Sequence, residues 1–275
     1  MAISTLDALL AALPSGQSLL LNKGTMANVT AGAPTSLWRA AGVPAQAAIP
    51  GVAATCNNST LGGMAFSNPG TGLTSYLAKA NLASGGIGTE IQFHDRLAHM
   101  GGLSGIVTTA QAVGVDVSVS TDNMADRRGR SNYRDVQWFL EWYTDTGATA
   151  ASAIVSYTAY DGSAGGAPGR SVIVSLAAST RAARYIPIIG TNNEPIMSVQ
   201  SVTLSSSTGT AGSFGVTASR LLGSVATGLS NAGVTFDWPQ IGFPRVPDSA
   251  CISLVLICNS SASGYLAGVV KLIQG

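Results

Sequence analysis

Charged side chains are scarce in this sequence of 275 residues. Only 10% of the residues are Asp, Glu, Lys or Arg, whereas a soluble globular domain carries about 25%. The 14 basic and 13 acidic residues leave a net charge of +1, so no overall field directs the chain toward nucleic acid. Two explanations fit this composition: a membrane protein, or a protein whose surface is largely covered by neighbouring subunits.

Long hydrophobic runs are also missing, although 46% of the residues are hydrophobic. A membrane-spanning helix needs about 20 consecutive apolar residues, and the most apolar stretch, Cys251 to Cys258, is too short. Aromatic residues make up 6%, which is few for the girdles of an outer-membrane barrel. Residues 1–13 lack the basic region of a signal peptide. We therefore expect no membrane association and favour a surface covered by other subunits.

Cysteine and histidine are few, which limits metal and nucleophile chemistry. The three cysteines form an odd number without metal-ligand spacing, so free buried thiols are expected. His94 and His99 are the only histidines, and a metal site would need further ligands such as Asp95 or Glu90. Ser104 follows, but its surroundings lack the last glycine of the G-x-S-x-G nucleophile elbow. No phosphate-binding glycine loop occurs. We expect no enzyme, no bound metal and no cofactor.

Acidic residues are concentrated in one part of the chain, which leaves one enzyme alternative open. Eight of the 13 acids lie between Glu90 and Asp145, and a pair of glycosidase carboxylates could be among them. The candidates are Glu90, Asp95 and Glu141. We favour the simpler interpretation that these charges form the solvated or ion-pairing face of a β-sheet.

Strand signals recur along the sequence, separated by turns. Between Val113 and Val119 every second residue is Val, the alternation of a half-buried strand. Residues 135–143 and 149–160 are joined by Thr144-Asp145-Thr146-Gly147 and are predicted to form a hairpin. Further strands are expected at 87–97, 170–176, 185–189, 196–204, 213–222, 235–241, 251–258 and 265–273. This pattern predicts a mainly β protein with a β-sandwich or jelly-roll-like fold.

The N-terminal region differs from the rest. Leu6, Leu9, Leu10 and Leu13 have helical spacing after a capping Ser4 or Thr5, which predicts a short helix. Residues 22–72 are rich in Gly, Ala, Pro, Asn and Thr, so long ordered loops are expected there, either as an arm on a partner or folded on the chain itself. We divide the chain into 1–72, helix and extended arm, and 73–275, β-rich core, with a sub-boundary considered near 162–169.

Arginine is the main candidate for contacts with other subunits, because it is enriched at protein interfaces. Arg127, Arg128, Arg130 and Arg134 lie within eight residues, next to Asp126 and Asp135. These acids cancel much of the local field, so we favour Arg-carboxylate pairs, within the chain or with a neighbour, over direct nucleic-acid contact. Trp38 and Arg39, in the ordered-looking segment 36–41, complete the candidate interface residues.

Three segments resemble a known class of proteins. The first segment consists of Asp95-Arg96-Leu97, His99 and Gly102-Leu103-Ser104. The second consists of Leu140-Glu141-Trp142-Tyr143 and Thr146-Gly147, and the third is Ser156-Tyr157-Thr158. This pattern, over about Trp38 to Leu222, resembles virion structural proteins of tailed bacteriophages.

The resemblance implies a capsid decoration (cement) protein of the phage head, assembled in the bacterial cytoplasm. Its expected partners are the major capsid protein and further copies of itself, with a homotrimer as one option. Two alternatives stay open. One is another virion component: major capsid, tail tube or neck protein. The other is a tail protein that binds or cleaves polysaccharide.

Overall fold

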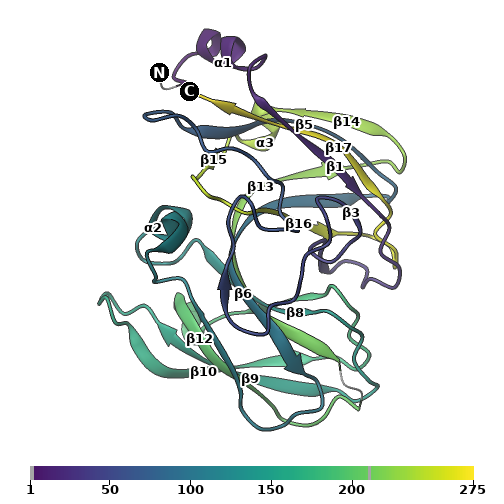
Figure 1. The fold of residues 1–275 in the computed structure, drawn as a ribbon. Coiled ribbons are helices and arrows are strands. Elements are labelled where there is room, and N and C mark those ends of the chain that lie inside the picture. Colours follow the sequence, from purple (N-terminus) through teal and green to yellow (C-terminus); the bar gives the residue numbers. More distant parts are fainter. Residues whose placement is uncertain (1–2, 210–211) are drawn as a thin grey trace.

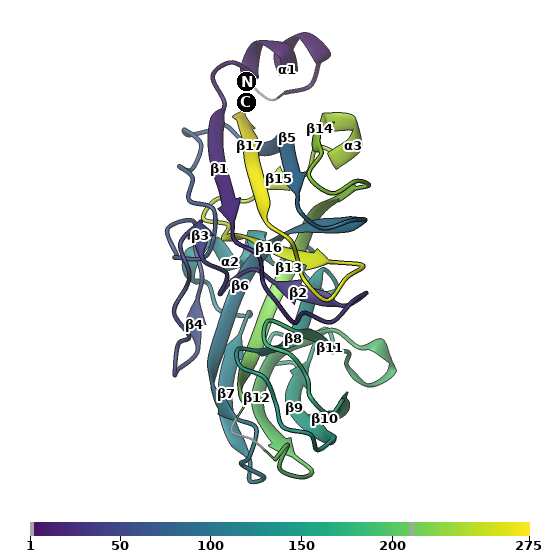
Figure 2. The same cartoon turned by 90° about the vertical axis from the view of Figure 1, so that its right-hand side faces the viewer.

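The chain folds into antiparallel β-sheets, as the strand pattern predicts. The computed structural model describes residues 3–209 and 212–275, and within these ranges the strands form three sheets. Figures 1 and 2 show an elongated molecule in which the sheets follow one another along the long axis. The predicted fold class, mainly β and sandwich-like with a short N-terminal helix, is confirmed.

A seven-stranded sheet occupies the middle of the molecule (Figure 1). Its two longest strands, β6 (Thr89–Ser104) and β13 (Ser213–Thr227), pair along almost their whole length. The strand order is β11 (Tyr185–Ile188), β8 (Val136–Trp142), β13, β6, β16 (Ile252–Ile257) and β2 (Pro34–Ser36), and β4 (Ala54–Thr55) pairs with β6 beyond the end of β16.

The two outer sheets each cover one end of this shared sheet. The six-stranded sheet contains β14 (Gly233–Asp237), β5 (Ser75–Ser84), β17 (Leu266–Gln274), β1 (Gln17–Lys23) and β3 (Gly42–Val43), with β15 (Arg245–Val246) beside β5. The four-stranded sheet has the order β10 (Ala167–Leu176), β9 (Ala151–Ala159), β12 (Ile196–Leu204) and β7 (Gln111–Asp116).

Each outer sheet buries a separate hydrophobic core against the shared sheet. Ile91 and Phe93 of β6 pack in the core beneath the six-stranded sheet. Leu97 and Leu103 of the same strand pack in the core beneath the four-stranded sheet. Since β6 runs through both cores, the molecule consists of two sandwiches that share one sheet.

The helices are short. Helix α1 (Leu6–Ala12) confirms the N-terminal prediction: the Thr5 side chain accepts a hydrogen bond from the Ala8 amide, and Leu9 packs against Ala78 and Ile273. Helix α2 (Met124–Arg127) follows η1 (Thr121–Asn123), α3 (Trp238–Ile241) follows β14, and η2 (Thr191–Asn193) follows β11. None of the helices in 3–209 and 212–275 has the length and apolar character needed to cross a membrane.

The predicted hairpin of residues 135–143 and 149–160 is wrong. Strand β8 pairs with β11 and β13 in the shared sheet, whereas β9 pairs with β10 and β12 in the four-stranded sheet. The turn between them therefore connects two packed layers. The reason is visible in β8: from Trp138 to Trp142 every residue is buried, so the strand needs a neighbour on both edges and protein on both faces.

The N-terminal region contributes strands to two of the sheets. Strand β1 pairs with β17, β2 with β16 and β4 with β6, so residues 1–72 and 73–275 share their sheets. Residues 162–169 lie at the turn between β9 and β10, which pair with each other.

Candidate functional site

Two buried ion pairs lie at the centre of the shared sheet, where β6 passes from one core to the other. Asp95 and Arg96 are consecutive residues of β6, so their side chains extend to opposite faces. Asp95 accepts two hydrogen bonds from Arg127, at 2.6 and 3.0 Å, and a third from the Cys251 amide at 2.8 Å. Both side chains of this pair are fully buried. Burial raises the pKa of Asp95, and the bidentate arginine and the backbone donor offset part of that effect.

The second pair joins Arg96 to Glu141 of β8 at 2.5 Å. The same guanidinium donates to the hydroxyls of Tyr185 at 2.7 Å and Thr217 at 3.0 Å, and lies 4.2 Å from the ring centroid of Trp38. Burial alone would raise the pKa of Glu141, but the charge and hydrogen bonds of Arg96 outweigh burial and hold that pKa below its usual value. The pair is therefore ionised at neutral pH and has a structural role.

The two ion pairs contain Asp95 and Glu141, which are two of the three candidate carboxylates for glycoside cleavage. Asp95 and Glu141 are buried and paired, so a substrate cannot reach them, and Glu90 accepts a hydrogen bond from Gln92. Ser104 is five residues from His99 along β6, a distance of about 17 Å at the usual strand rise. Ser104 and His99 are therefore too far apart for acyl transfer, and the carboxylates of Asp95 and Glu141 are each held in an ion pair with an arginine. In the part of the chain that the structure describes, no group of three or more potential metal ligands occurs.

His94, the other candidate, has a defined structural role and gives a testable prediction. Its buried ring contacts Ser219 Oγ at 3.1 Å and Gln92 Oε1 at 3.0 Å, and burial lowers its pKa to about 4. An unfolded chain protonates this group near pH 6.5. Stability is therefore complete above pH 6.5 and falls as the pH drops toward 4, by about 3 kcal/mol.

Urea unfolding of wild type and His94→Gln between pH 7.5 and pH 4 measures this effect. The variant should lose the part of the pH dependence that lies between pH 6.5 and pH 4. An equally steep fall in both proteins would contradict the assignment.

The Arg-rich segment runs from α2 to the start of β8, and its members have different environments. Arg127 is fully buried in the ion pair with Asp95. Arg128 stacks on Tyr133 with its guanidinium carbon 4.5 Å from the ring centroid. Arg130 pairs with Asp135 at 2.6 Å near the surface. The prediction of Arg-carboxylate pairs is thus confirmed for Arg127 and Arg130, and both pairs lie within the chain.

The other candidate interface residues also differ in how far they are buried. Trp38 is buried against Arg96 and His99, which leaves its ring no exposed face. Arg39 is half-buried and donates to the Ala47 carbonyl. Arg134 is exposed, and its guanidinium makes no hydrogen bond or ion pair with any residue that the structure describes. Arg134 is therefore the member of the predicted set with a free charged group on the surface.

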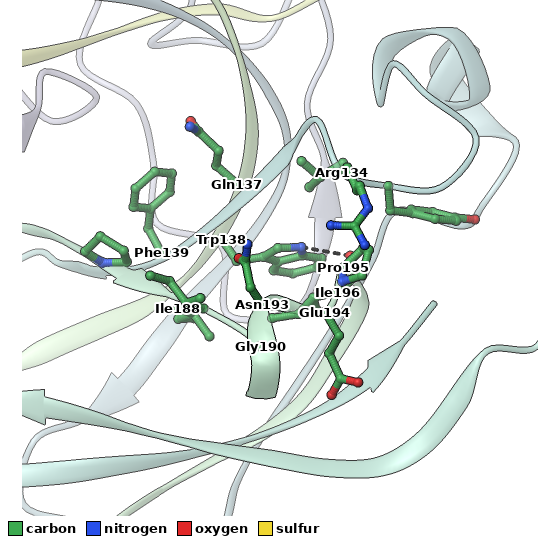
Figure 3. Close-up of a pocket in the computed structure, with 14 residues that line it drawn as sticks. Arg134, Gln137, Trp138, Phe139, Ile188, Gly190, Asn193, Glu194, Pro195 and Ile196 are labelled. Carbon is green, nitrogen blue, oxygen red and sulfur yellow. Dashed lines mark hydrogen bonds between the residues drawn. The ribbon is translucent and has the colours of Figure 1, made fainter. Parts of the chain in front are cut away.

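A pocket of about 320 Å³ opens beside Arg134 between β8, β11 and the start of β12 (Figure 3). Trp138 and Ile188 form its apolar floor, and the Trp138 indole N–H donates to the Ile196 carbonyl at 3.0 Å. Figure 3 shows Arg134 and Gln137 around this floor, with their side chains pointing in different directions.

Polar groups of both signs lie around the pocket. The Glu194 carboxylate accepts a hydrogen bond from the Tyr157 hydroxyl at 2.6 Å, so it is fixed in place. The Trp138 and Phe139 rings line the pocket but are only 3% and 8% exposed, so little ring surface is open for a sugar to stack on. A free guanidinium, an exposed amide and a fixed carboxylate can hydrogen-bond to the polar side chains of a protein partner.

The outer face of the four-stranded sheet is the least charged surface of regular structure. Burial alternates along β9, so that Ala153, Val155 and Tyr157 face the core. The residues between them, and the outward-facing residues of the other three strands, are Ser152, Ile154, Ser156, Thr158, Ser171, Ile173, Ser175, Ser198, Gln200, Ser201, Thr203, Ala112, Gly114 and Asp116. Asp116 is the one charged residue among them. We call these fourteen residues the neutral face.

One side of the neutral face, over β9 and β10, is apolar. Ile173 and Ile154 are direct cross-strand partners and are 68% and 40% exposed. Strand β10, which carries Ile173, is also an edge strand of the sheet. An uncharged face beside an unpaired edge is a combination that free proteins usually avoid and that interfaces use.

Comparisons with known proteins give no relative. The chain matches no family model, no curated protein and no solved structure.

Sequence reasoning missed the neutral face and the burial of the two ion pairs. The signal for that burial was present: Asp95-Arg96 lies between Phe93 and Leu97 in a strand-like segment, and opposite charges at such a position require partners if they are buried. The neutral face had a weaker signal, the alternation of Ser and Thr with buried Val and Tyr along β9.

Proposed function

We propose that this chain is a structural protein of a tailed-phage virion, a capsid decoration protein that stabilises the shell by packing against the major capsid subunits. The observation that carries the proposal is the neutral face, a surface of four strands with one charged residue. The resemblance to phage virion proteins in the segments around Asp95, Glu141 and Tyr157 supplies the identity of the partner.

Burial of charge makes the surface even poorer in charge than the composition indicates. Three of the 14 basic residues (Lys23, Arg96 and Arg127) and two of the 13 acidic residues (Asp95 and Glu141) are buried. A monomer in free solution depends on surface charge to avoid association. A surface with so few charges supports permanent contact with other subunits.

The size of the neutral face fits part of a stable interface. Four strands about 4.8 Å apart and about eight residues long, at about 3.3 Å per residue, cover roughly 500 Å². A specific interface needs about 800 Å² on each partner, so the face provides more than half of one such contact. The β10 edge and the pocket beside Arg134 border the same sheet and can supply the remainder. Repetition by shell symmetry then adds many such contacts.

Binding to shells that lack the chain tests the proposal. Shells assembled without this gene are mixed with the purified chain and sedimented. We expect saturable co-sedimentation, together with a higher temperature of shell disruption. A chain that stays in the supernatant at every concentration, or that binds without saturation, would argue against a decoration role.

A further inference from the structure

Two of the three cysteines lie side by side in the fold, although 195 residues separate them in the sequence (Cys56 and Cys251). The Cys56 amide donates to the Leu97 carbonyl at 2.9 Å, and the Arg96 amide donates to the Cys251 carbonyl at 2.8 Å. Both cysteines therefore pair with consecutive residues of β6. Since β13 occupies the other edge of β6, the end of β4 and the start of β16 meet on the same edge.

The side chains of these cysteines also meet. Cys56 and Cys251 belong to one small buried cluster with Trp38 and Ala47, so their side chains lie together. Both are free thiols. Cys258 is free as well but lies in a different cluster, and its thiol is 3.9 Å from the Ser263 carbonyl oxygen. The three cysteines are thus one adjacent pair and one isolated residue.

The two thiols of the pair differ in acidity. Burial works to raise the pKa of Cys56, but hydrogen bonding with Cys251 and His99 and the nearby positive charge of Arg96 outweigh it and hold that pKa well below its usual value. The hydrogen bond to Cys56, together with burial, raises the pKa of Cys251. Cys56 is therefore the more acidic thiol of the pair and the better source of the nucleophilic thiolate, whereas Cys251 holds its proton more tightly.

We propose that Cys56 and Cys251 form a latent disulfide site, which a peroxide converts into a cross-link between the loop after β4 and the start of β16. In the first step the Cys56 thiolate attacks one peroxide oxygen. The O–O bond breaks, and Cys56 becomes a sulfenic acid while hydroxide leaves and takes up a proton to form water. In the second step the Cys251 sulfur attacks the Cys56 sulfur, its proton leaves with the sulfenic hydroxyl as water, and the S–S bond forms. Two thiols are oxidised by two electrons, and one hydrogen peroxide is reduced to two waters.

Access for the oxidant requires only a local opening. The thiols are buried, but β4 consists of two residues and pairs with β6 alone. Side-chain hydrogen bonds also hold this segment, from Arg127 to the Cys56 carbonyl and from Thr55 and Asn57 to Asp122. With so few backbone hydrogen bonds, it still opens at lower free energy than the cores. Once formed, the cross-link fastens this segment permanently to the shared sheet. A particle component that leaves a reducing cytoplasm for an oxidising medium would gain stability in this way.

Thiol counting on the full chain tests the proposal. Purified protein is treated with hydrogen peroxide at a small molar excess, denatured, alkylated with N-ethylmaleimide and weighed by mass spectrometry. We expect the number of alkylated cysteines to fall from three to one, with a Cys56–Cys251 peptide in the digest. The melting temperature should rise by roughly 5–10 °C, since the cross-link closes a loop of nearly 200 residues.

Cys258→Ser is the matched control, because it removes the isolated thiol and leaves the pair intact. It should still form the cross-link and end with no alkylated cysteine, whereas Cys251→Ser should form none. Three alkylated cysteines after oxidation of wild type, a cross-link that includes Cys258, or sulfinic acid at Cys56 without a cross-link would each overturn the proposal. If Cys251→Ser fails to fold, wild type and Cys258→Ser still decide the question.

Discussion

Replacement of Arg127 by alanine is expected to lower the free energy of unfolding by about 3–5 kcal/mol. The substitution leaves the Asp95 carboxylate buried without its counter-charge. It also removes donors from the Cys56 and Arg96 carbonyls, which accept from Arg127 at 2.6 and 3.0 Å. Arg127 thus ties α2, the segment after β4 and the shared sheet together. Urea unfolding at neutral pH, followed by fluorescence and circular dichroism, measures the change.

Arg130→Ala is the control for this prediction. Arg130 makes an equally short ion pair, at 2.6 Å, but its side chain is 64% exposed, and exposed pairs contribute about 0–1 kcal/mol. The double variant Asp95→Leu/Arg127→Met should recover much of the loss, because it removes both charges from the interior. An Arg127→Ala protein as stable as Arg130→Ala would show that the buried pair does not hold the centre of the fold.

Replacement of Ile173 by glutamate is expected to weaken binding to shells by at least about tenfold, with almost no change in the stability of the chain. Ile173 is exposed on β10, the edge strand of the neutral face, so a carboxylate there is solvated in the free protein. In a packed interface this carboxylate would be buried without a partner. Such burial costs more than about 1.4 kcal/mol, the free energy that corresponds to a tenfold loss of affinity. Co-sedimentation with shells measures the binding, and thermal unfolding measures the stability.

Ile87→Glu is the matched control. Ile87 is 64% exposed, close to the exposure of Ile173, but it lies in the turn between β5 and β6, away from the four-stranded sheet. This variant should bind shells as the wild type does. Equal binding by all three proteins would remove the neutral face as the docking surface, and equal loss by both variants would point to non-specific repulsion.

The strand positions were largely predictable from the sequence. Alternating Val in residues 113–119 and β-branched runs such as 251–258 correspond to β7 and β16, because half-buried strands need that pattern. Strands β1 and β5 gave little signal. The segment of β5, Ser-Tyr-Leu-Ala-Lys-Ala-Asn-Leu-Ala-Ser, is rich in residues with low strand propensity. Its place between β14 and β17 is set by tertiary contacts.

Strand partners were not predictable in the same way. The turn Thr144-Asp145-Thr146-Gly147 has hairpin chemistry, yet it leads from the shared sheet to the four-stranded sheet. Its backbone contacts show why: the Thr146 amide donates to the Thr180 carbonyl, and the Ser179 amide donates to the Gly147 carbonyl. A turn sequence specifies the local bend, whereas the choice of sheet depends on where distant strands bury their faces.

The candidate site shows the same limit. Clustering of arginine beside acidic residues indicated ion pairs in this segment, and the pair of Arg130 with Asp135 is local enough to expect. The pairing of Arg127 with Asp95, and the contact of Cys56 with Cys251, join residues far apart in sequence. Neither spacing nor composition contains that information.

Copy number in purified particles tests the central proposal most directly. Quantitative mass spectrometry of the intact phage compares this chain with the major capsid protein, and particle images locate it. A decoration role predicts hundreds of copies spread over the shell, in a fixed ratio to the capsid subunits. Tens of copies at one vertex would indicate a neck or tail component instead. Complete absence from the particle would contradict the account of this chain as a protein that acts by packing within a virion.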